Sequence, residues 1–411
     1  MFELAVMGAW LEFAVRWLHV ITGIAWIGAS FYFIALDLGL RKVVNGPVGV
    51  SGEEWQVHGG GFYHVQKYVV APAAMPEDLI WYKWEAYSTW LSGFALMVLV
   101  YYFGAELFLI DPTVMDLAVW QAVAISIGSL AFGWVAYDSI CKTKFGDDNT
   151  RLMVALYAIL VVVAWGYAQV FSGRAALLHL GAFTATIMSA NVFFIIMPNQ
   201  RIVVADLKAG RTPDAKYGKI AKQRSTHNNY LTLPVIFLML SNHYPLAFAS
   251  QYNWAIASLV FLMGVTIRHF FNTMHAKKVT LWWTWAATAI LFILIMWLST
   301  AFPYGSAAGE DGEVADLSGT AATFAAADGF DEVTDIVMGR CSMCHASEPG
   351  WEGMLWAPKG VILDSPAAVA KHAQAIYVQA GITHAMPPGN LSFIEQDERD
   401  KIAAWYRTAL K

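Results

Sequence analysis

Residues 17–36 read "WLHVITGIAWIGASFYFIAL", a stretch without any Asp, Glu, Lys or Arg. An α-helix needs about 20 mostly apolar residues to cross a bilayer, so this stretch is long enough to span a membrane. The run continues without a small-residue cleavage site, and we therefore expect it to stay as a membrane anchor. Similar runs predict eight transmembrane helices, at residues 10–37, 86–106, 114–140, 152–171, 174–197, 229–248, 254–272 and 281–302.

The composition divides the chain into two unlike regions. Residues 1–302 contain 19 Lys and Arg against 16 Asp and Glu, a net charge of +3, whereas residues 303–411 contain 7 against 15, a net charge of −8. We predict an all-α chain with a transmembrane domain at residues 1–302, an acidic Ala- and Gly-rich linker at 303–325 and a soluble domain at 326–411. Neither region has the strongly basic balance of a nucleic-acid binder, so no nucleic-acid partner is expected.

Lys and Arg gather in every second connection between the predicted helices. The connections after the first, third, fifth and seventh helices hold nearly all of them, and the largest group lies at residues 199–224. By the positive-inside rule these connections face the cytoplasm. Both termini and the soluble domain then lie on the other side of the membrane, which for a bacterial inner membrane is the periplasm.

Residues 340–346 read "RCSMCHA", which contains the C-x-x-C-H pattern of covalent c-type haem attachment. In this pattern Cys341 and Cys344 form thioethers with the haem, and His345 is one axial ligand of the iron. A redox dithiol or half of a zinc site is the alternative for a C-x-x-C pair. The adjoining His and the presence of only one other cysteine, Cys141, make those alternatives weaker.

The sequence around this motif predicts a small class I cytochrome c domain. Residues 328–345 are predicted to form a helix that leads into the haem, and residues 391–410 a C-terminal helix with Ser392 and Glu395 in a capping-box pattern. Met386, in "GITHAMPPGN", is the best candidate for the second axial ligand, because a thioether there would raise the reduction potential. His384 is a weaker candidate, and we expect it to lie at the surface.

Two histidines lie inside predicted membrane helices, where ionisable groups are costly and mark functional sites by default. A constant offset of 160 residues aligns His19 with His179, which suggests a duplicated four-helix unit. At equivalent depths in the outer half of the bundle, the pair could ligate a b-type haem. The alternative is that both are hydrogen-bonded core histidines.

The first predicted cytoplasmic connection contains "EEWQVHGGGFYHVQKY" at residues 53–68. A glycine triplet lets backbone approach a ligand closely, and the surrounding rings could stack on a planar molecule. His58 and His64 are candidate proton acceptors, and Lys67 could hold an anion. The alternative is an amphipathic segment with aromatic residues at the membrane interface.

Together these segments resemble a known family. The stretch "RWLHVITGIAWIGASFYFIALDLGLRK", the segments "HGGGFYHVQKY" and "WYKWEAYSTWLSG", and the C-terminal "CSMCH" and "MPP" are similar to the bacterial membrane-bound, cytochrome c-linked urate oxidase (urate hydroxylase) family. The resemblance implies oxidation of urate to 5-hydroxyisourate, with electrons passed through the c-type haem to a soluble or membrane cytochrome c or a terminal oxidase. It carries haem roles to Cys341, Cys344, His345 and Met386, and no substrate-binding residues.

Two other functions remain open at this point. A haem electron conduit would relay electrons from another donor and would have no small-molecule substrate of its own. A transporter with a regulatory cytochrome would move a solute without reducing the haem. The sequence disfavours the transporter, because apart from Pro234 and Pro245 it lacks the broken-helix pairs typical of such proteins.

Overall fold

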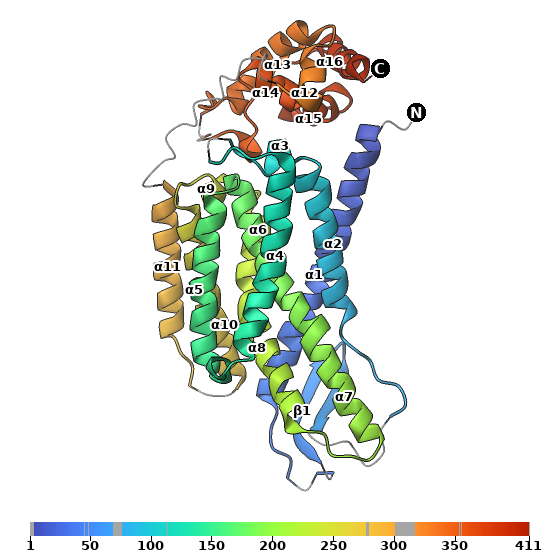
Figure 1. The fold of residues 1–411 in the computed structure, drawn as a ribbon, viewed down its shortest axis with the longest axis vertical. Helices are drawn as coiled ribbons and strands as arrows, with labels where there is room; N and C mark the ends of the chain where they lie inside the picture. The colour runs from blue at the N-terminus through green and yellow to red at the C-terminus, as the bar shows by residue number, and fades with distance from the viewer. Residues whose placement is uncertain are drawn as a thin grey trace.

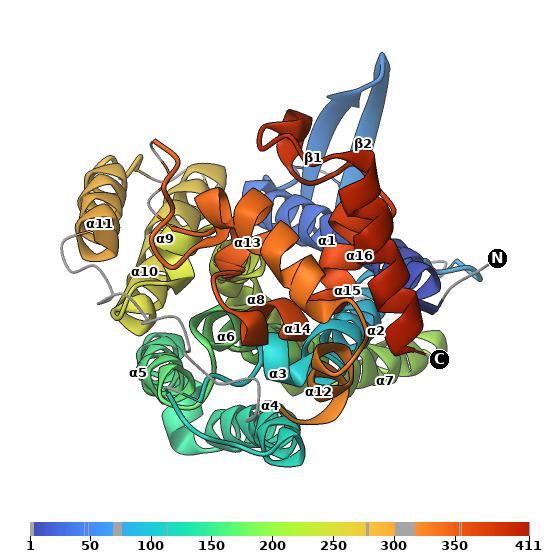
Figure 2. The ribbon, with the colours of Figure 1, turned by 90° about the horizontal axis from the view of Figure 1, so that it is seen from above.

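The computed structural model describes residues 4–44, 46–47, 49–68, 76–112, 114–276, 279–300, 317–352, 354 and 356–410. Most of these residues are helical. Long helices stand side by side in a bundle that runs to residue 300, and we call residues 317–410 the tail (Figure 1). The tail lies over one end of the bundle, and a β-hairpin lies at the other end. Seen from above, the tail leaves α5 and α11 uncovered (Figure 2).

The bundle is built from helices that overlap the eight predicted ranges. They are α1 (Leu4–Gly39), α2 (Trp84–Leu96) with its continuation η1 (Met97–Tyr102), α4 (Val119–Cys141), α5 (Asn149–Ala168), α6 (Gly173–Ala190) with η3 (Asn191–Ile196) and α7 (Met197–Lys208), α8 (Ala215–Ser241), α10 (Asn253–His275) and α11 (Trp283–Thr300). Short helices connect them: α3 (Ala105–Phe108), η2 (Lys144–Asp147) and α9 (Pro245–Phe248).

Several of these helices are suited to a membrane. Within the described residues, five are long and apolar enough to cross a bilayer, and α11 is a shorter apolar helix. The five segments are Val6–Gly39, Val119–Cys141, Asn149–Ala168, Gly173–Lys208 and Asn253–His275. This is consistent with a membrane protein, whereas the count of eight spans and the orientation of the chain stay predictions.

Helix α8 differs from the range that was predicted for it. It begins at Ala215, well before residue 229, because the polar residues that precede the apolar run continue the same helix. Pro234 lies inside α8, and its ring packs against Gly264 of α10, where an added Cβ would lie 2.5 Å from the proline Cδ. Glycine at position 264 therefore lets the two helices approach closely.

The hairpin is a correction to the all-α prediction. Strands β1 (Val50–His58) and β2 (Gly61–Tyr68) pair in antiparallel register, with His58 opposite Gly61. Gly59 and Gly60 form the turn with φ of +57° and +80°, the conformation that a two-residue turn between twisted strands requires. The glycine triplet is thus explained by the turn, a signal that the interpretation as a ligand-binding loop overlooked.

The tail is a small helical body with its own hydrophobic core. Its elements are α12 (Gly319–Ala325), α13 (Phe330–His345), η5 (Pro358–Gly360), α14 (Pro366–Lys371), α15 (Ala373–Ile376), η6 (Tyr377–Gly381), η7 (Pro388–Asn390) and α16 (Gln396–Ala409). Phe324 of α12 packs on Trp405 and Tyr406 of α16 in this core. Residues 319–325, which were predicted to be linker, therefore belong to the tail, while residues 301–316 lie outside the described residues.

Helix α16 is capped one turn later than predicted. Glu395, rather than Ser392, is the N-cap residue, and the Glu398 side chain completes the capping box by accepting from the Glu395 N–H at 2.7 Å. Glu398 also accepts hydrogen bonds from the Arg340 guanidinium at 2.9–3.1 Å. Because Arg340 precedes Cys341, this ion pair holds the end of α13 against the start of α16.

This ion pair predicts an acid-sensitive tail. Burial would raise the pKa of Glu398, but the hydrogen bonds from Arg340 and from the Glu395 N–H outweigh it and hold the pKa below its ordinary value. A carboxyl with a lowered pKa stabilises the fold above its unfolded pKa, near 4.5, and loses this contribution as the pH falls through the lower folded value. We expect Glu398→Gln to lower the melting temperature of the full-length protein's tail at pH 6, and the difference from wild type to narrow toward pH 3.5 in calorimetry.

Asp400→Asn is the matched control for this experiment. Asp400 lies on the same helix, is exposed and accepts a hydrogen bond from Gln396 at 3.0 Å. It should shift the melting temperature little at either pH. A difference between Glu398→Gln and wild type that stays constant from pH 6 to 3.5 would contradict the assignment.

Candidate functional site

The haem-attachment sequence occupies the last turn of α13. Cys341 and Cys344 are three residues apart on this helix, so their side chains share one face. His345 Nδ1 donates a hydrogen bond to the carbonyl oxygen of Val361 at 2.8 Å, and Nε2 has no partner among the described residues. Metal-binding histidines characteristically donate their second ring N–H to such an acceptor. These residues therefore fit the group that the motif predicts.

The Cys341 thiol is largely buried. Burial, and then the neighbouring Cys344, raise the pKa of Cys341 to about 11. The Cys341 thiol is therefore neutral near pH 7.

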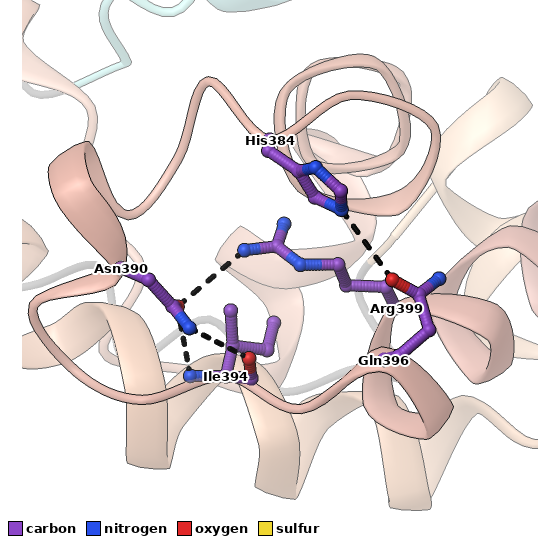
Figure 3. A pocket seen from close by; sticks show the side chains of 5 residues that line it. All are labelled: His384, Asn390, Ile394, Gln396 and Arg399. Atoms are coloured by element: carbon purple, nitrogen blue, oxygen red, sulfur yellow. Dashed lines mark hydrogen bonds between the residues drawn. The ribbon is translucent and has the colours of Figure 1, made fainter.

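The predicted second ligand lies on a loop that Arg399 holds in place. Met386 is half-buried, and its carbonyl oxygen accepts from Arg399 Nη1 at 2.9 Å. The same guanidinium, 3% exposed, also binds the carbonyl of Ala380 at 2.7 Å. A hollow of about 460 Å³ beside this loop is lined by His384, Asn390, Ile394, Gln396 and Arg399 (Figure 3). Arg399 therefore uses its hydrogen-bond donors to position the Met386 loop.

His384 lies at the surface, as expected. It is exposed, and its Nε2 lies 3.4 Å from the side-chain oxygen of Gln396 (Figure 3). Among the described residues, no three His, Cys, Asp or Glu side chains converge as a metal site.

Both ring nitrogens of His179 have hydrogen-bond partners inside the bundle core. Its Nδ1 donates to the carbonyl of Ala175 at 2.8 Å, and its Nε2 lies 2.9 Å from the hydroxyl of Ser126. The ring is completely buried among aromatic residues, the nearest being Phe171 at 4.8 Å between ring centroids. Both ring nitrogens therefore have hydrogen-bond partners, as the alternative of a core histidine describes, and a role of His179 as a haem ligand stays a prediction.

His19 has a different environment from His179. Its Nδ1 lies 3.0 Å from the carbonyl of Thr89 and 3.1 Å from the hydroxyl of Ser92, both on α2. Its Nε2 has no partner among the described residues. His19 thus contacts the next helix, whereas His179 contacts α4, so the structure does not place the two histidines equivalently. The b-type haem and its ligation by His19 and His179 stay predictions.

The hairpin separates its three candidate catalytic residues. His64 stacks on Trp55 with 4.2 Å between ring centroids, and its Nε2 lies 2.8 Å from Glu53. Successive residues of a strand point to opposite faces, and the strand register places His58 and Lys67 on the face opposite to His64. The structure therefore does not bring the three side chains together.

The Lys67 side chain forms an ion pair with the bundle. Its ammonium group forms an ion pair with Asp37 at the end of α1, and Asp37 also binds Lys222 of α8 at 3.3 Å. Burial, and then the charge of Lys222, lower the pKa of Lys67. These contacts attach the hairpin to the bundle.

A buried polar network lies inside the bundle, at the end that carries the hairpin. Arg224 of α8, 2% exposed, forms an ion pair with Asp138 of α4 at 2.7 Å and donates to Asn191 at 3.2 Å. The hydroxyl of Tyr137 lies 2.7 Å from Nδ1 of His227, and His227 Nε2 is buried without a hydrogen-bond partner in the described structure. We call these residues, with Asn228, the α4–α8 network.

Asn191 and Asn228 join this network to helix α6. Asn191 donates to Asn228 at 3.0 Å, and Asn228 donates to the carbonyl of Met188 at 2.9 Å. Asn191 is the first residue of η3, where the α-helical hydrogen-bond pattern widens to a π-helix. π-helical turns within helices occur frequently at functional sites.

A second network lies on the opposite side of α8. Asn229 accepts from Asn272 of α10 at 3.0 Å, and Asn272 accepts from Arg268 at 3.1 Å. The Arg268 guanidinium lies over the ring of Phe31 of α1, 4.1 Å from its centroid. Arg268 is 5% exposed and Asn229 is completely buried.

Both networks contain residues of one segment of α8, to which the sequence pattern was not used to give a role. Residues 224–230 read "RSTHNNY", and its polar residues Arg224, His227 and Asn228 follow the i, i+3, i+4 spacing of one helix face. This spacing was a usable signal. It was missed because Arg224 was interpreted as the end of a basic connection and the helix was predicted to begin at residue 229.

A comparison with protein families identifies the part of the chain that contains these networks. The family described as urate oxidase N-terminal matches residues 5–299. The chain belongs to the urate oxidase N-terminal family. No curated protein and no solved structure matches the chain.

The match to the urate oxidase N-terminal family covers the bundle and the hairpin, and it ends before the tail. The tail meets the family domain close to the candidate haem ligand. Arg174 of α6 donates to the carbonyl of Lys359, two residues before Val361, whose carbonyl binds His345. Phe248 of α9 lies beside Gly360, 3.6 Å from the position of an added Cβ. The segment that orients His345 is therefore in direct contact with the urate oxidase N-terminal domain.

Proposed function

We propose that this chain is a membrane-bound urate oxidase that converts urate to 5-hydroxyisourate and passes the electrons through a C-terminal c-type haem to the respiratory chain. The observation that carries the proposal is the family match over residues 5–299, which relates the whole bundle to urate oxidation. The haem-attachment motif at Cys341, Cys344 and His345 gives the tail the role of carrying these electrons.

The reaction sets the tasks that the protein must perform. The urate monoanion and one water give 5-hydroxyisourate, one proton and two electrons. A c-type haem, when bound, accepts one electron at a time and delivers it to a soluble or membrane cytochrome c or a terminal oxidase. Cys341 and Cys344 would hold it covalently, with His345 and Met386 as iron ligands. The contact of Arg174 with Lys359 keeps this segment against the bundle.

The proton requires an acceptor inside the bundle or beside it. His227 is suited to this role, because its buried Nε2 has no partner in the described structure while its Nδ1 is hydrogen-bonded to Tyr137. Nε2 can accept a proton when Nδ1 carries the ring proton and donates it in the hydrogen bond to the Tyr137 oxygen. His58, His64 and Lys67 stay part of the proposal as weaker candidates, because the hairpin separates them.

The proposed location follows from the apolar helices and the distribution of charge. The protein would lie in the bacterial inner membrane with both termini and the tail in the periplasm, where c-type haem is attached. In Figure 1 the tail and the hairpin lie at opposite ends of the bundle, which supports placing them on opposite sides of the membrane.

The decisive test is anaerobic addition of urate to the purified full-length protein. We expect the absorption spectrum of the covalently bound haem to change from that of the oxidised to that of the reduced form. One molecule of 5-hydroxyisourate should form for every two electrons accepted. With an external cytochrome c present, turnover should continue without hydrogen peroxide. If urate leaves the haem oxidised while another electron donor reduces it, the chain is an electron conduit instead.

A further inference from the structure

Arg268 is a buried cation without a counter-charge among the described residues. It lies inside α10, one of the helices apolar enough to cross a membrane, and only 5% of it is exposed. No carboxylate among the described residues lies within ion-pair distance of it, and its Nε has no hydrogen-bond partner there. Burying an unpaired charge is costly. We therefore expect an anion to bind beside the guanidinium of Arg268. Arg224, the other buried arginine of the bundle, has Asp138 in this role.

Two buried N–H donors at Arg268 and Asn229 have no acceptor in the described structure. Asn272 accepts from Arg268 Nη2 at 3.1 Å and donates to Asn229 Oδ1 at 3.0 Å, which fixes the orientation of both partners. The Asn229 amide is thereby turned so that its Nδ2, completely buried, has no partner in the described structure. Arg268 Nε and Asn229 Nδ2 thus both lack an acceptor.

Phe31 completes the arrangement from helix α1. Its ring centroid lies 4.1 Å from the central carbon of the guanidinium, within the range of a cation–π contact. A contact of this kind with an aromatic face restricts the rotation of the guanidinium plane. A planar heterocyclic anion presents adjacent oxygen and nitrogen acceptors along one edge, which match a planar row of N–H donors.

We propose that Arg268 and Asn229, oriented by Asn272 and Phe31, form a binding site for a planar organic monoanion. The identity of this anion as urate rests on the proposed function. Arg268 neutralises the charge, and Asn229 Nδ2 binds an oxygen or a ring nitrogen of the same molecule. The site lies on the side of α8 opposite to His227, so His227 does not contact the bound anion, and the anion site does not depend on His227 as the proton acceptor.

The test measures binding and not turnover. Full-length protein in detergent, with its haem chemically reduced under anaerobic conditions, is dialysed against radiolabelled urate. We expect Arg268→Gln to weaken the Kd for urate by about 10- to 100-fold, the range of a lost charge-assisted hydrogen bond. Arg268→Lys should recover part of the affinity, because it restores the charge without the planar fork. Asn229→Ala, which leaves Arg268 in place, should weaken the Kd by a smaller factor.

Arg211→Gln is the control for net charge. Arg211 is exposed, lies beyond the end of α7 and pairs with Asp206, so its loss should leave the Kd unchanged. Gel filtration and melting temperature confirm that each variant is folded. Wild-type affinity for urate in Arg268→Gln would overturn the site.

A second probe separates this inference from the proposed function. Orotate is a planar heterocyclic monoanion, and the same dialysis is repeated with it. If the wild type binds orotate but not urate, and Arg268→Gln abolishes that binding, the anion site stands and urate is not its ligand. If the wild type binds urate and Arg268→Gln has no effect, urate binding stands and the site is wrong. If the wild type binds neither anion, the site is also wrong.

Discussion

The Cys341→Ala/Cys344→Ala double variant is expected to lose all covalently bound haem. Both thioethers of the predicted attachment site come from these two side chains, which share one face of the last turn of α13. The measurement is peroxidase staining of the full-length protein on a denaturing gel, on which non-covalent haem is lost. Staining at the position of the full-length double variant would contradict the assignment.

Cys141→Ala is the matched control, because it removes the remaining cysteine of the chain. Cys141 ends α4 inside the bundle, far from α13 in sequence, and its loss should leave the staining unchanged. The double variant should also fail to transfer electrons from urate to external cytochrome c. Its Kd for urate should stay at the wild-type value, since Arg268 and Asn229 lie within the bundle.

The sequence predicted the tail well where local signals are strong. The helix into the attachment motif and the C-terminal helix both lie where they were expected, as α13 and α16. The start of the tail was placed too late, because the short helix α12 has a composition that resembles a linker. Only its burial against Trp405 and Tyr406 makes it part of the core, and such a contact between distant segments has no local signal.

Apolar runs in the sequence also located the long helices, but they did not predict the polar residues that lie inside the bundle. A run ends, by composition, where polar residues begin, so α8 was predicted from residue 229 although it starts at Ala215. Arg224 and His227 were therefore assigned to a connection. Whether such residues face water or a neighbouring helix depends on packing, here on the position of Asp138 and Tyr137 in α4.

The candidate site was the least predictable part. His179 carries the same signal as a haem ligand, a histidine inside an apolar helix, yet Ala175 and Ser126 engage both of its nitrogens. In the hairpin, alternation of the strand faces separates residues that are close in sequence. Neither outcome can be read from residue type and spacing alone, because both depend on what lies opposite the side chain.

Asp138→Asn is expected to destabilise the bundle by about 3–5 kcal/mol, the range for removal of one partner from a buried ion pair. It leaves the Arg224 guanidinium, 2% exposed, with Asn191 at 3.2 Å and a cation–π contact to Tyr137 at 4.9 Å from the ring centroid. Neither contact supplies a negative charge. The measurement is the free energy of unfolding from reversible denaturation with an ionic detergent in mixed micelles.

Arg224→Met is expected to cost less than Asp138→Asn, and this asymmetry tests the explanation. Asp138 also binds Lys142 at 2.6 Å, and Lys142 is 68% exposed, so the carboxylate left behind keeps a cation that reaches solvent. The double variant should be more stable than Asp138→Asn alone, because it no longer buries an uncompensated guanidinium. Lys142→Ala, the surface control, should cost at most about 1 kcal/mol. If the double variant loses the sum of the two single losses, Arg224 and Asp138 do not interact, and the α4–α8 network does not have the energetic role that its geometry indicates.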